Sequence, residues 1–340
     1  MNSLIVVPTS GYNTDLVREN MLESSASFRE ISLYGKRLFI TDDNSRLMDF
    51  PGNIAIVRPE GLHSRKVKDA DTTVKLDNVE IGGKSLVIAA GPCAVESEDQ
   101  MLEIAENVKK LGADMLRGGA FKPRTTPYSF QGLGKRGISI LEHAKAVTGL
   151  PIVTEMMDIS DYGAFDADVD MIQIGSRNSQ NFSLLKFLGA QDRPVLFKNG
   201  MANTISEWLS SSEYLLSGGN ENVVLCYRGT RGFDNATRFT MDSGVIPVLR
   251  ERTHLPVCAD PSHPAGDRNY VESIALAAVA AGADMLEIEV HNNPESALSD
   301  SKQQLTFEEF GRLVRNARRI TEILGNGPRK QVNQDSSSFF

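Results

Sequence analysis

From about Leu86 onward, the sequence alternates short β-rich runs with segments in which apolar residues recur every three or four positions. The second spacing is typical of amphipathic helices, whereas almost continuously apolar runs are typical of parallel strands that are buried on both faces. The alternation repeats eight times, and the predicted strands are Leu86–Ala90, Asp114–Arg117, Ile152–Glu155, Met171–Gly175, Val195–Lys198, Val223–Tyr227, Pro256–Asp260 and Met285–Val290. Eight units over about 240 residues predict an α/β fold, a (β/α)8 TIM barrel spanning residues 85–324.

An open, doubly wound sheet is the alternative α/β arrangement. Such sheets that bind nucleotides carry a glycine-rich phosphate loop directly after a strand. No G-x-G-x-x-G follows any of the predicted strands, and G-x-x-x-x-G-K-[ST] is absent from the sequence. These absences favour the closed barrel.

The first 70 residues have a different pattern. We predict a strand at Leu4–Pro8, a helix at Thr14–Leu22, a hairpin at Phe28–Thr41, a short helical patch after Asp42 and a strand at Asn53–Arg58. This βαββαβ order is that of a small ferredoxin-like α+β domain, over residues 1–70.

Two further segments flank the predicted barrel. Residues 71–84 alternate apolar and polar side chains about Asp77-Asn78, which predicts a β-hairpin that closes the bottom of the barrel. Residues 325–340 are polar and rich in serine, and we expect a flexible tail there.

Charge and composition restrict the class of partner. The chain has 36 Lys and Arg against 44 Asp and Glu, a formal net charge of −8. Nucleic-acid-binding domains usually carry a basic face, so the balance argues against nucleic acid and anionic membranes as partners. No apolar stretch approaches the roughly 20 residues of a membrane helix, and the N-terminus lacks the basic region of a signal peptide.

The three cysteines, Cys93, Cys226 and Cys258, form no C-x-x-C pair. An odd number without that spacing argues against a disulfide framework. We therefore expect a cytoplasmic protein.

Polar residues stand where the predicted strands end, which is the side of a (β/α)8 barrel that carries the chemistry. In chain order, the strand ends supply Cys93, Arg117, Glu155, Arg177, Lys198, Arg228, Asp260 with His263, and Glu289. The following loops add Lys122 and Arg124 after the second strand and Asp300 after the eighth.

The cations among these residues form a first candidate site, consisting of Arg117, Lys122, Arg124, Arg177, Lys198, Arg228 and Arg231. Any single rim cation is more often solvated or paired with an acid. Several that converge on one mouth are costly unless anions neutralise them, and arginine matches phosphate and carboxylate oxygens in a bidentate manner. We therefore predict at least two anionic groups on the substrates.

The second candidate site combines sulfur, nitrogen and oxygen donors, from Cys93, His263, Glu289 and Asp300. This mixture suits a divalent transition metal such as Mn, Fe, Co or Zn better than Mg or Ca, which prefer oxygen ligands. Taken one at a time, the same residues are explained as a buried thiol, a loop histidine and solvated acids.

These residues stand in six motifs: GPCAVE at 91–96, LRGGAFKPRTT at 116–126, PYSFQGLG at 127–134, IQIGSRN at 172–178, DPSH at 260–263 and ALSD at 297–300. The chain resembles the 3-deoxy-D-arabino-heptulosonate 7-phosphate (DAHP) synthases, in particular the type I subgroup with an N-terminal ferredoxin-like domain. The resemblance runs from Thr73 to about Leu324.

The resemblance implies the first step of the shikimate pathway, the condensation of phosphoenolpyruvate with erythrose 4-phosphate. It implies that Cys93, His263, Glu289 and Asp300 hold the metal. It also implies that the phosphoenolpyruvate phosphate meets Arg177, Lys198 and Arg228, that its carboxylate meets Arg117 and Lys122, and that erythrose 4-phosphate meets Arg124 and Thr125. Lys122 is the expected proton donor, and Glu155 and Asp260 would steer water or support the ligands.

The resemblance leaves alternatives open. Related 3-deoxy-octulosonate 8-phosphate synthases carry out the same chemistry with arabinose 5-phosphate. The Lys122–Thr125 motif favours erythrose 4-phosphate. Asn199 and Ser301 depart from the usual pattern of the resembled subgroup, and such departures bear on the aldose preference. A non-catalytic phosphate-binding paralogue is a third alternative. The N-terminal domain resembles a regulatory domain that binds an aromatic amino acid, or else it serves assembly alone. We expect a homo-oligomer, a dimer or a tetramer.

Overall fold

The computed structural model describes residues 4–8, 13–23, 27–41, 54–57, 61–165 and 168–325. Eight parallel strands form a closed barrel in chain order, the last pairing with the first. They are β7 (Val87–Gly91), β8 (Met115–Arg117), β9 (Ile152–Glu155), β10 (Met171–Ile174), β11 (Val195–Lys198), β12 (Val223–Tyr227), β13 (Val257–Ala259) and β14 (Met285–Glu289). The predicted (β/α)8 barrel is therefore confirmed, and no strand begins or ends more than one residue from its predicted position.

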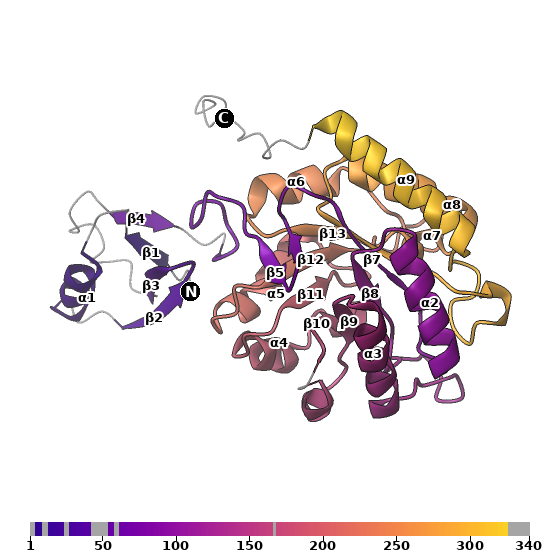
Figure 1. Ribbon diagram of the computed structural model, residues 1–340. Helices are drawn as coiled ribbons and strands as arrows, with labels where there is room; N and C mark the ends of the chain where they lie inside the picture. Colours follow the sequence, from indigo (N-terminus) through magenta and orange to yellow (C-terminus); the bar gives the residue numbers. More distant parts are fainter. Residues whose placement is uncertain are drawn as a thin grey trace.

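Helices surround the barrel on its outer side (Figure 1). They are α2 (Glu98–Lys110), α3 (Lys135–Thr148), α4 (Phe182–Gly189), α5 (Ile205–Leu216), α6 (Val245–Arg252), α7 (Ser262–Ala265), α8 (Arg268–Ala280) and α9 (Phe307–Leu324). Helix α9 begins with a capping box, in which Thr306 and Glu309 satisfy each other's backbone N–H groups. In the described part of the connection from β9 to β10, the only helix is a 3-10 helix, Ile159–Ala164.

A β-hairpin, β5 (Val74–Leu76) and β6 (Val79–Ile81), covers the bottom of the barrel. Its turn residue Asp77 has a φ of +48°, a left-handed conformation that Asp adopts more readily than most side chains. The four apolar hairpin residues form one buried cluster with inward-facing residues of the barrel strands, including Cys226 and Cys258. The predicted hairpin and its position are therefore confirmed.

The N-terminal sheet has the strand order β2-β3-β1-β4, with every neighbouring pair antiparallel. Its elements are β1 (Leu4–Pro8), α1 (Thr14–Glu23), β2 (Phe28–Leu33), β3 (Lys36–Thr41) and β4 (Ile54–Val57). This is the strand order of a ferredoxin-like sheet. The helical patch predicted after Asp42 lies outside the described residues.

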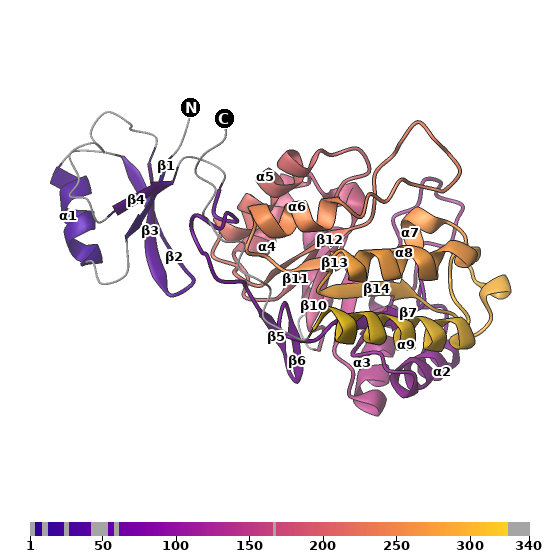
Figure 2. The ribbon, with the colours of Figure 1, turned by 90° about the horizontal axis from the view of Figure 1, so that it is seen from above.

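The small sheet lies beside the barrel and is joined to it by the segment that leads into β5 (Figure 2). Residues of β1 and of the β2–β3 hairpin, such as Ile5 and Leu38, belong to the same buried cluster as the barrel helices. At the hairpin tip, the Tyr34 ring meets the His254 ring edge-to-face, with their centroids 4.8 Å apart. Across the described residues, no helix is both long and apolar enough to cross a membrane.

Candidate active site

A cavity of about 370 Å³ opens at the carboxyl ends of the barrel strands. All seven cations singled out in the sequence line it, together with Thr125, Glu155, His263 and Asp300. Further residues that the sequence did not single out also line the cavity, among them Gln173, Arg238 and Phe239. The strand ends and loops therefore converge on one site, as the barrel topology requires.

The floor of this cavity is a buried network of ion pairs around Glu287. The Glu287 carboxylate accepts from Arg117 Nε at 3.3 Å and lies 2.7 Å from Lys198 Nζ. Lys198 Nζ also donates to Asp260 Oδ2 at 2.7 Å, and Arg117 Nη1 lies 3.4 Å from Glu289 Oε1. Glu287 was not predicted because it does not stand at the end of its strand. Alternate residues of a strand share a face, so the position of Glu287 could have been inferred from that of Glu289.

The pairing keeps the floor charged despite its burial. Burial alone would lower the pKa of Lys198, but Asp260 and Glu287 outweigh it and raise that pKa well above the usual value. Burial would likewise raise the pKa of Asp260, but His263 and Lys198 outweigh it and hold the pKa well below the usual range. Both partners therefore stay ionised near neutral pH.

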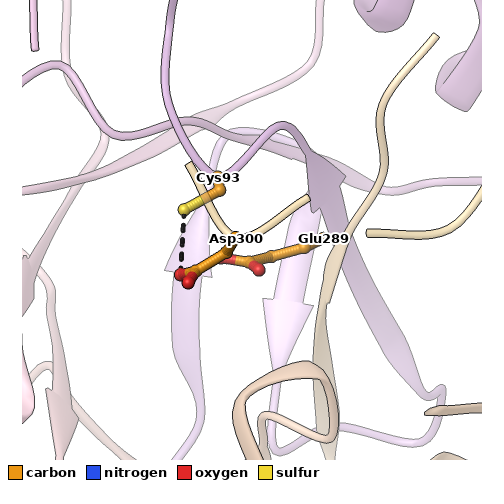
Figure 3. A group of neighbouring side chains, drawn as sticks. All are labelled: Cys93, Glu289 and Asp300. Carbon is orange, nitrogen blue, oxygen red and sulfur yellow. Dashed lines mark hydrogen bonds between the residues drawn. The ribbon is translucent and has the colours of Figure 1, made fainter. Parts of the chain in front are cut away.

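Three of the four candidate metal ligands meet at one point. The sulfur of Cys93 and carboxylate oxygens of Glu289 and Asp300 all lie within 4.8 Å of one another (Figure 3). Asp300 has a φ of +46°, a left-handed conformation of the kind that concentrates at functional sites. Cys93 Sγ donates to Asp300 Oδ2 at 3.3 Å.

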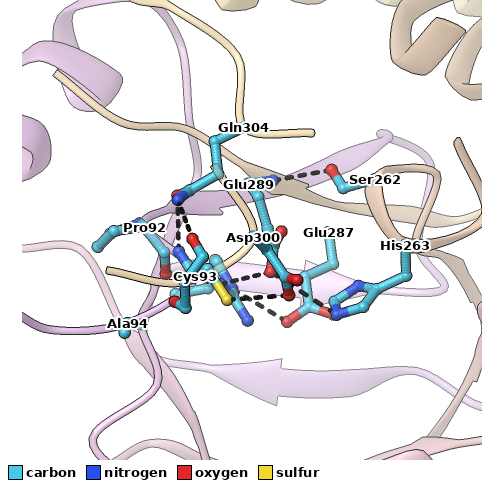
Figure 4. A network of polar contacts seen from close by, with 12 residues as sticks. Pro92, Cys93, Ala94, Ser262, His263, Glu287, Glu289, Asp300 and Gln304 are labelled. Carbon is cyan, nitrogen blue, oxygen red and sulfur yellow. Dashed lines mark hydrogen bonds and ion pairs between the residues drawn. The ribbon is translucent and has the colours of Figure 1, made fainter. Parts of the chain in front are cut away.

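His263 lies beside this trio rather than within it (Figure 4). Its Nε2 is 3.7 Å from Glu289 Oε1, and its Nδ1 is 2.6 Å from Asp260 Oδ2. A ring whose Nδ1 side faces a carboxylate presents Nε2 for coordination, which is a common arrangement of histidine ligands.

The chemistry of this donor set fits a divalent transition metal. Burial, reinforced by Glu289, raises the pKa of the Cys93 thiol to about 12, so the thiol is protonated when no cation is bound. A divalent cation would supply the positive charge that favours the thiolate and neutralises the two carboxylates. Sulfur, oxygen and an adjacent imidazole together are donors of intermediate softness.

Lys122 lies against the trio and is buried. Its Nζ donates to the Cys93 carbonyl at 2.9 Å and contacts Cys93 Sγ at 3.1 Å. Glu155 also lines the cavity, and burial raises its pKa despite the nearby Lys122 and Lys198. Gly175 leaves room for that carboxylate, because a Cβ at this position would lie 1.9 Å from Glu155 Oε1.

The opposite end of the cavity is cationic. Arg228 is 4% exposed, and its guanidinium lies over the Phe239 ring at 3.9 Å from the centroid. Among the described residues, its Nη1 has no hydrogen-bond partner. Burial lowers the pKa of Arg228, and repulsion from Arg238 and Arg177 acts in the same direction although Asp260 opposes it. An anion at this end would satisfy both the unpaired nitrogen and the excess charge.

Asn199 links the segment that follows β11 to the segment that follows β12 and carries Arg228. The Asn199 side chain accepts from Arg228 N at 2.8 Å and donates to the carbonyl of Gly229 at 3.0 Å. Asn199, which departs from the pattern of the resembled subgroup, therefore fixes the backbone that carries Arg228. At the rim, Arg124 and Thr125 line the cavity, and Arg238 Nη1 donates to Asp300 Oδ1 at 3.1 Å.

Comparison with solved structures finds the same fold in a bacterial enzyme. A crystal structure of phospho-2-dehydro-3-deoxyheptonate aldolase (DAHP synthase) from Thermotoga maritima matches with a TM-score of 0.78 and 39% identity, covering 95% of this chain and 98% of that one. A truncated form of the 3-deoxy-D-arabino-heptulosonate 7-phosphate synthase from the same organism matches with a TM-score of 0.73 and 42% identity, covering 78% of this chain and 97% of that one.

Sequence comparison gives the same result. The phospho-2-dehydro-3-deoxyheptonate aldolase of Thermotoga maritima is 42% identical over 296 residues, which are 87% of this chain and 88% of that protein. A 2-dehydro-3-deoxyphosphooctonate aldolase of Desulfatibacillum aliphaticivorans is 32% identical over 252 residues, 68% of this chain and 91% of that protein. The DAHP synthetase I family matches residues 66–324, so the chain belongs to this family.

Proposed function

We propose that this protein condenses phosphoenolpyruvate with erythrose 4-phosphate to give DAHP and inorganic phosphate, in a metal-dependent reaction of the shikimate pathway. The observation that carries the proposal is the cavity in which the Cys93–Glu289–Asp300 trio faces a cluster of cations, in a chain of the DAHP synthetase I family. Two phosphorylated substrates need several cations, and an aldehyde acceptor benefits from a Lewis acid.

Phosphoenolpyruvate would bind at the cationic end. Arg177, Lys198 and Arg228 would hold its phosphate, and the unpaired Nη1 of Arg228 supports that assignment. Lys198 has three donor hydrogens, and among the described residues Asp260 and Glu287 take two, which leaves one for a ligand. Arg117 and Lys122 would face the carboxylate of the same substrate.

Erythrose 4-phosphate would enter from the rim, where Arg124 and Thr125 would receive its phosphate. Cys93, His263, Glu289 and Asp300 would hold a divalent transition metal, Mn, Fe, Co or Zn. When bound, such an ion supplies Lewis acidity that polarises the aldehyde of the aldose. The cations next to it hold two anionic substrates together against their mutual repulsion.

Carbon three of phosphoenolpyruvate forms the new bond to the aldehyde carbon, and Lys122 delivers a proton to the resulting alkoxide. Its ammonium is positioned for this because Cys93 O and Sγ fix it at 2.9 and 3.1 Å. Water adds at carbon two, and the phosphate leaves. Glu155 and Asp260 would orient that water and the neighbouring ligands.

The test is an assay of phosphate release with phosphoenolpyruvate and either erythrose 4-phosphate or arabinose 5-phosphate, on chelated and then metal-restored protein. We expect turnover with erythrose 4-phosphate only after metal is restored. Turnover only with arabinose 5-phosphate would instead support the second candidate, an octulosonate-type reaction, which the 32% identical octonate aldolase favours. Release with neither aldose under any metal would leave a non-catalytic phosphate-binding barrel.

A substitution at Cys93 tests the assigned metal ligands separately from the integrity of the fold. Cys93→Ala should abolish the metal-dependent turnover and leave the circular dichroism spectrum unchanged. Full activity of this variant would contradict the assigned ligands.

The remaining expectations extend the proposal beyond the cavity. We propose residues 1–70 as a regulatory or assembly domain, 71–84 as a linking hairpin, 85–324 as the catalytic barrel and 325–340 as a tail. An aromatic amino acid is the proposed effector, and a cytoplasmic dimer or tetramer is the proposed state. Activity with and without phenylalanine, tyrosine or tryptophan, and the mass in solution, test these points.

A further inference from the structure

A loop between β14 and α9 returns over the metal-ligand trio and carries two consecutive glutamines. Gln303 and Gln304 are 2% and 0% exposed. The neighbouring Leu305 pairs with the backbone just beyond β14, because its N–H donates to the Glu289 carbonyl at 2.9 Å and its carbonyl accepts from His291 N at 3.0 Å. These backbone hydrogen bonds therefore fix the position of the two glutamines next to the trio.

Gln304 joins two of the ligand-bearing segments (Figure 4). Its Oε1 accepts from the backbone N–H of Cys93 at 2.9 Å, and its Nε2 donates to the Ser299 carbonyl at 2.9 Å. Ser299 immediately precedes Asp300. One amide group therefore sets the spacing between the loop that carries Cys93 and the loop that carries Asp300.

Gln303 acts on the carboxylates themselves. Its Nε2 donates to Glu289 Oε2 at 2.6 Å, and its Oε1 accepts from Arg238 Nη1 at 2.8 Å. The same Arg238 nitrogen donates to Asp300 Oδ1 at 3.1 Å. Gln303 and Arg238 thus occupy one oxygen of each carboxylate.

The other oxygens face the sulfur and the imidazole. Asp300 Oδ2 accepts from Cys93 Sγ at 3.3 Å, and Glu289 Oε1 lies 3.7 Å from His263 Nε2. Each carboxylate therefore has one oxygen held by Gln303 or Arg238, and its other oxygen is directed to the common point. At that point, Glu289 Oε1 also accepts from Arg117 Nη1 at 3.4 Å. A glutamine suits this task because it offers a donor and an acceptor without adding charge beside two carboxylates.

We propose that Gln303 and Gln304 are positioning residues that hold the ligands in place for a divalent transition metal. The inference rests on the proposed metal-dependent function. Partners that orient ligands in this way typically contribute 10- to 100-fold to metal affinity, since a free carboxylate or loop must be ordered when the ion binds.

The experiment measures the dissociation constant for Co²⁺ through the thiolate-to-cobalt absorption band, which reports on Cys93 directly. The variants are Gln303→Met and Gln304→Met, which keep volume and remove the amide. The control is Gln191→Met; within the described part of the chain, the Gln191 side-chain amide contacts only the carbonyl of Phe187 in α4. We expect about 10- to 100-fold weaker binding in the two variants and less than a twofold change in the control.

Unfolding of the metal-free proteins in urea separates positioning from a general structural role. Each Met variant leaves buried groups without a hydrogen bond, so the urea midpoint of the metal-free protein should fall whatever the role of the amide. Positioning predicts that Co²⁺ binding is weakened as well, under conditions in which the metal-free variant is folded. Lower midpoints with wild-type Co²⁺ affinity would overturn the proposal, and so would wild-type protein that binds no Co²⁺. Gln303→Asn and Gln304→Asn, which keep a buried amide but fall one methylene short, serve if the Met variants do not fold.

These readouts are independent of the aldose. Wild-type protein that binds Co²⁺ but turns over neither aldose would contradict the proposed function, whereas the comparison of Co²⁺ affinities would still decide the role of the glutamines.

Discussion

Replacing Arg228 with methionine should stabilise the ligand-free protein while it destroys the phosphoenolpyruvate site. Arg228 is buried, its Nη1 has no partner among the described residues, and repulsion from Arg238 adds to the cost of its charge. A methionine at this position would keep contact with the Phe239 ring, over which the guanidinium lies at 3.9 Å. The protein would therefore lose an unfavourable charge and retain most of the packing.

The magnitude follows from two opposing contributions. A buried polar group without a partner costs about 1–3 kcal/mol, whereas a cation over an aromatic ring contributes about 0.5–2 kcal/mol. The expected net gain on Arg228→Met is about 1 kcal/mol in the free energy of unfolding. Truncating a buried charge that pairs with a ligand costs at least about 2 kcal/mol of binding, which is about a 30-fold loss of phosphoenolpyruvate affinity.

Urea unfolding of both proteins, with and without phosphoenolpyruvate and in the absence of aldose, measures both effects. Wild-type protein at 100 times its dissociation constant should gain about 2.7 kcal/mol from the ligand, and the variant should gain little at the same concentration. Arg315→Met, on the exposed face of α9, is the control and should retain the full ligand effect. A variant that is less stable than wild type without ligand, yet stabilised equally by phosphoenolpyruvate, would refute the reasoning.

Three further predictions concern other parts of the chain. Burial lowers the pKa of His254 from 6.5 to about 3, so protons bind preferentially to the unfolded chain between these values and stability falls as the pH falls. Between pH 7 and 4 this amounts to about 3 kcal/mol, which His254→Gln should remove in urea unfolding at the two pH values; an unchanged pH dependence would contradict it. Gly175→Ala should displace the Glu155 carboxylate and lower kcat about 100-fold in the phosphate-release assay, and unaltered kcat would exclude Glu155 from the reaction. Lys198→Met should lower the free energy of unfolding by about 3–5 kcal/mol, because it leaves buried carboxylates without their shared cation, and adding Glu287→Gln should restore part of the loss.

The barrel could be predicted from the sequence because its signal repeats eight times, and an error in one unit does not change the architecture. The predicted strand ends differ from the observed ones by at most one residue. Asp260, for example, was predicted as the last residue of a strand that ends at Ala259, although its N–H still donates to the Tyr227 carbonyl of the neighbouring β12. The connection after β9 was also less regular than the alternation suggests, since Asp158 caps a 3-10 helix there.

The candidate site could be predicted as far as residues stand at strand ends, since parallel strands bring these ends together. Glu287 was missed although the alternation within β14 places it on the same face as Glu289. Arg238, Gln303 and Gln304 come from loops, where no periodic pattern relates a residue to the strand ends. Their contacts with the trio depend on how the loops fold back, which spacing alone does not determine.

The four cations at the strand ends, Arg117, Arg177, Lys198 and Arg228, divide into two groups that the sequence could not separate. Arg117 and Lys198 are neutralised from within by Glu287, Glu289 and Asp260, so their presence alone does not require an anionic ligand. Arg177 and Arg228, in contrast, have no carboxylate within ion-pair distance among the described residues, and Arg228 has the unpaired nitrogen. A cation at a strand end therefore indicates an anionic substrate only when the inward positions of the neighbouring strands carry no acid to match it. By that criterion, we expect the phosphate of phosphoenolpyruvate at Arg177 and Arg228, with Lys198 contributing the one donor hydrogen that Asp260 and Glu287 leave among the described residues.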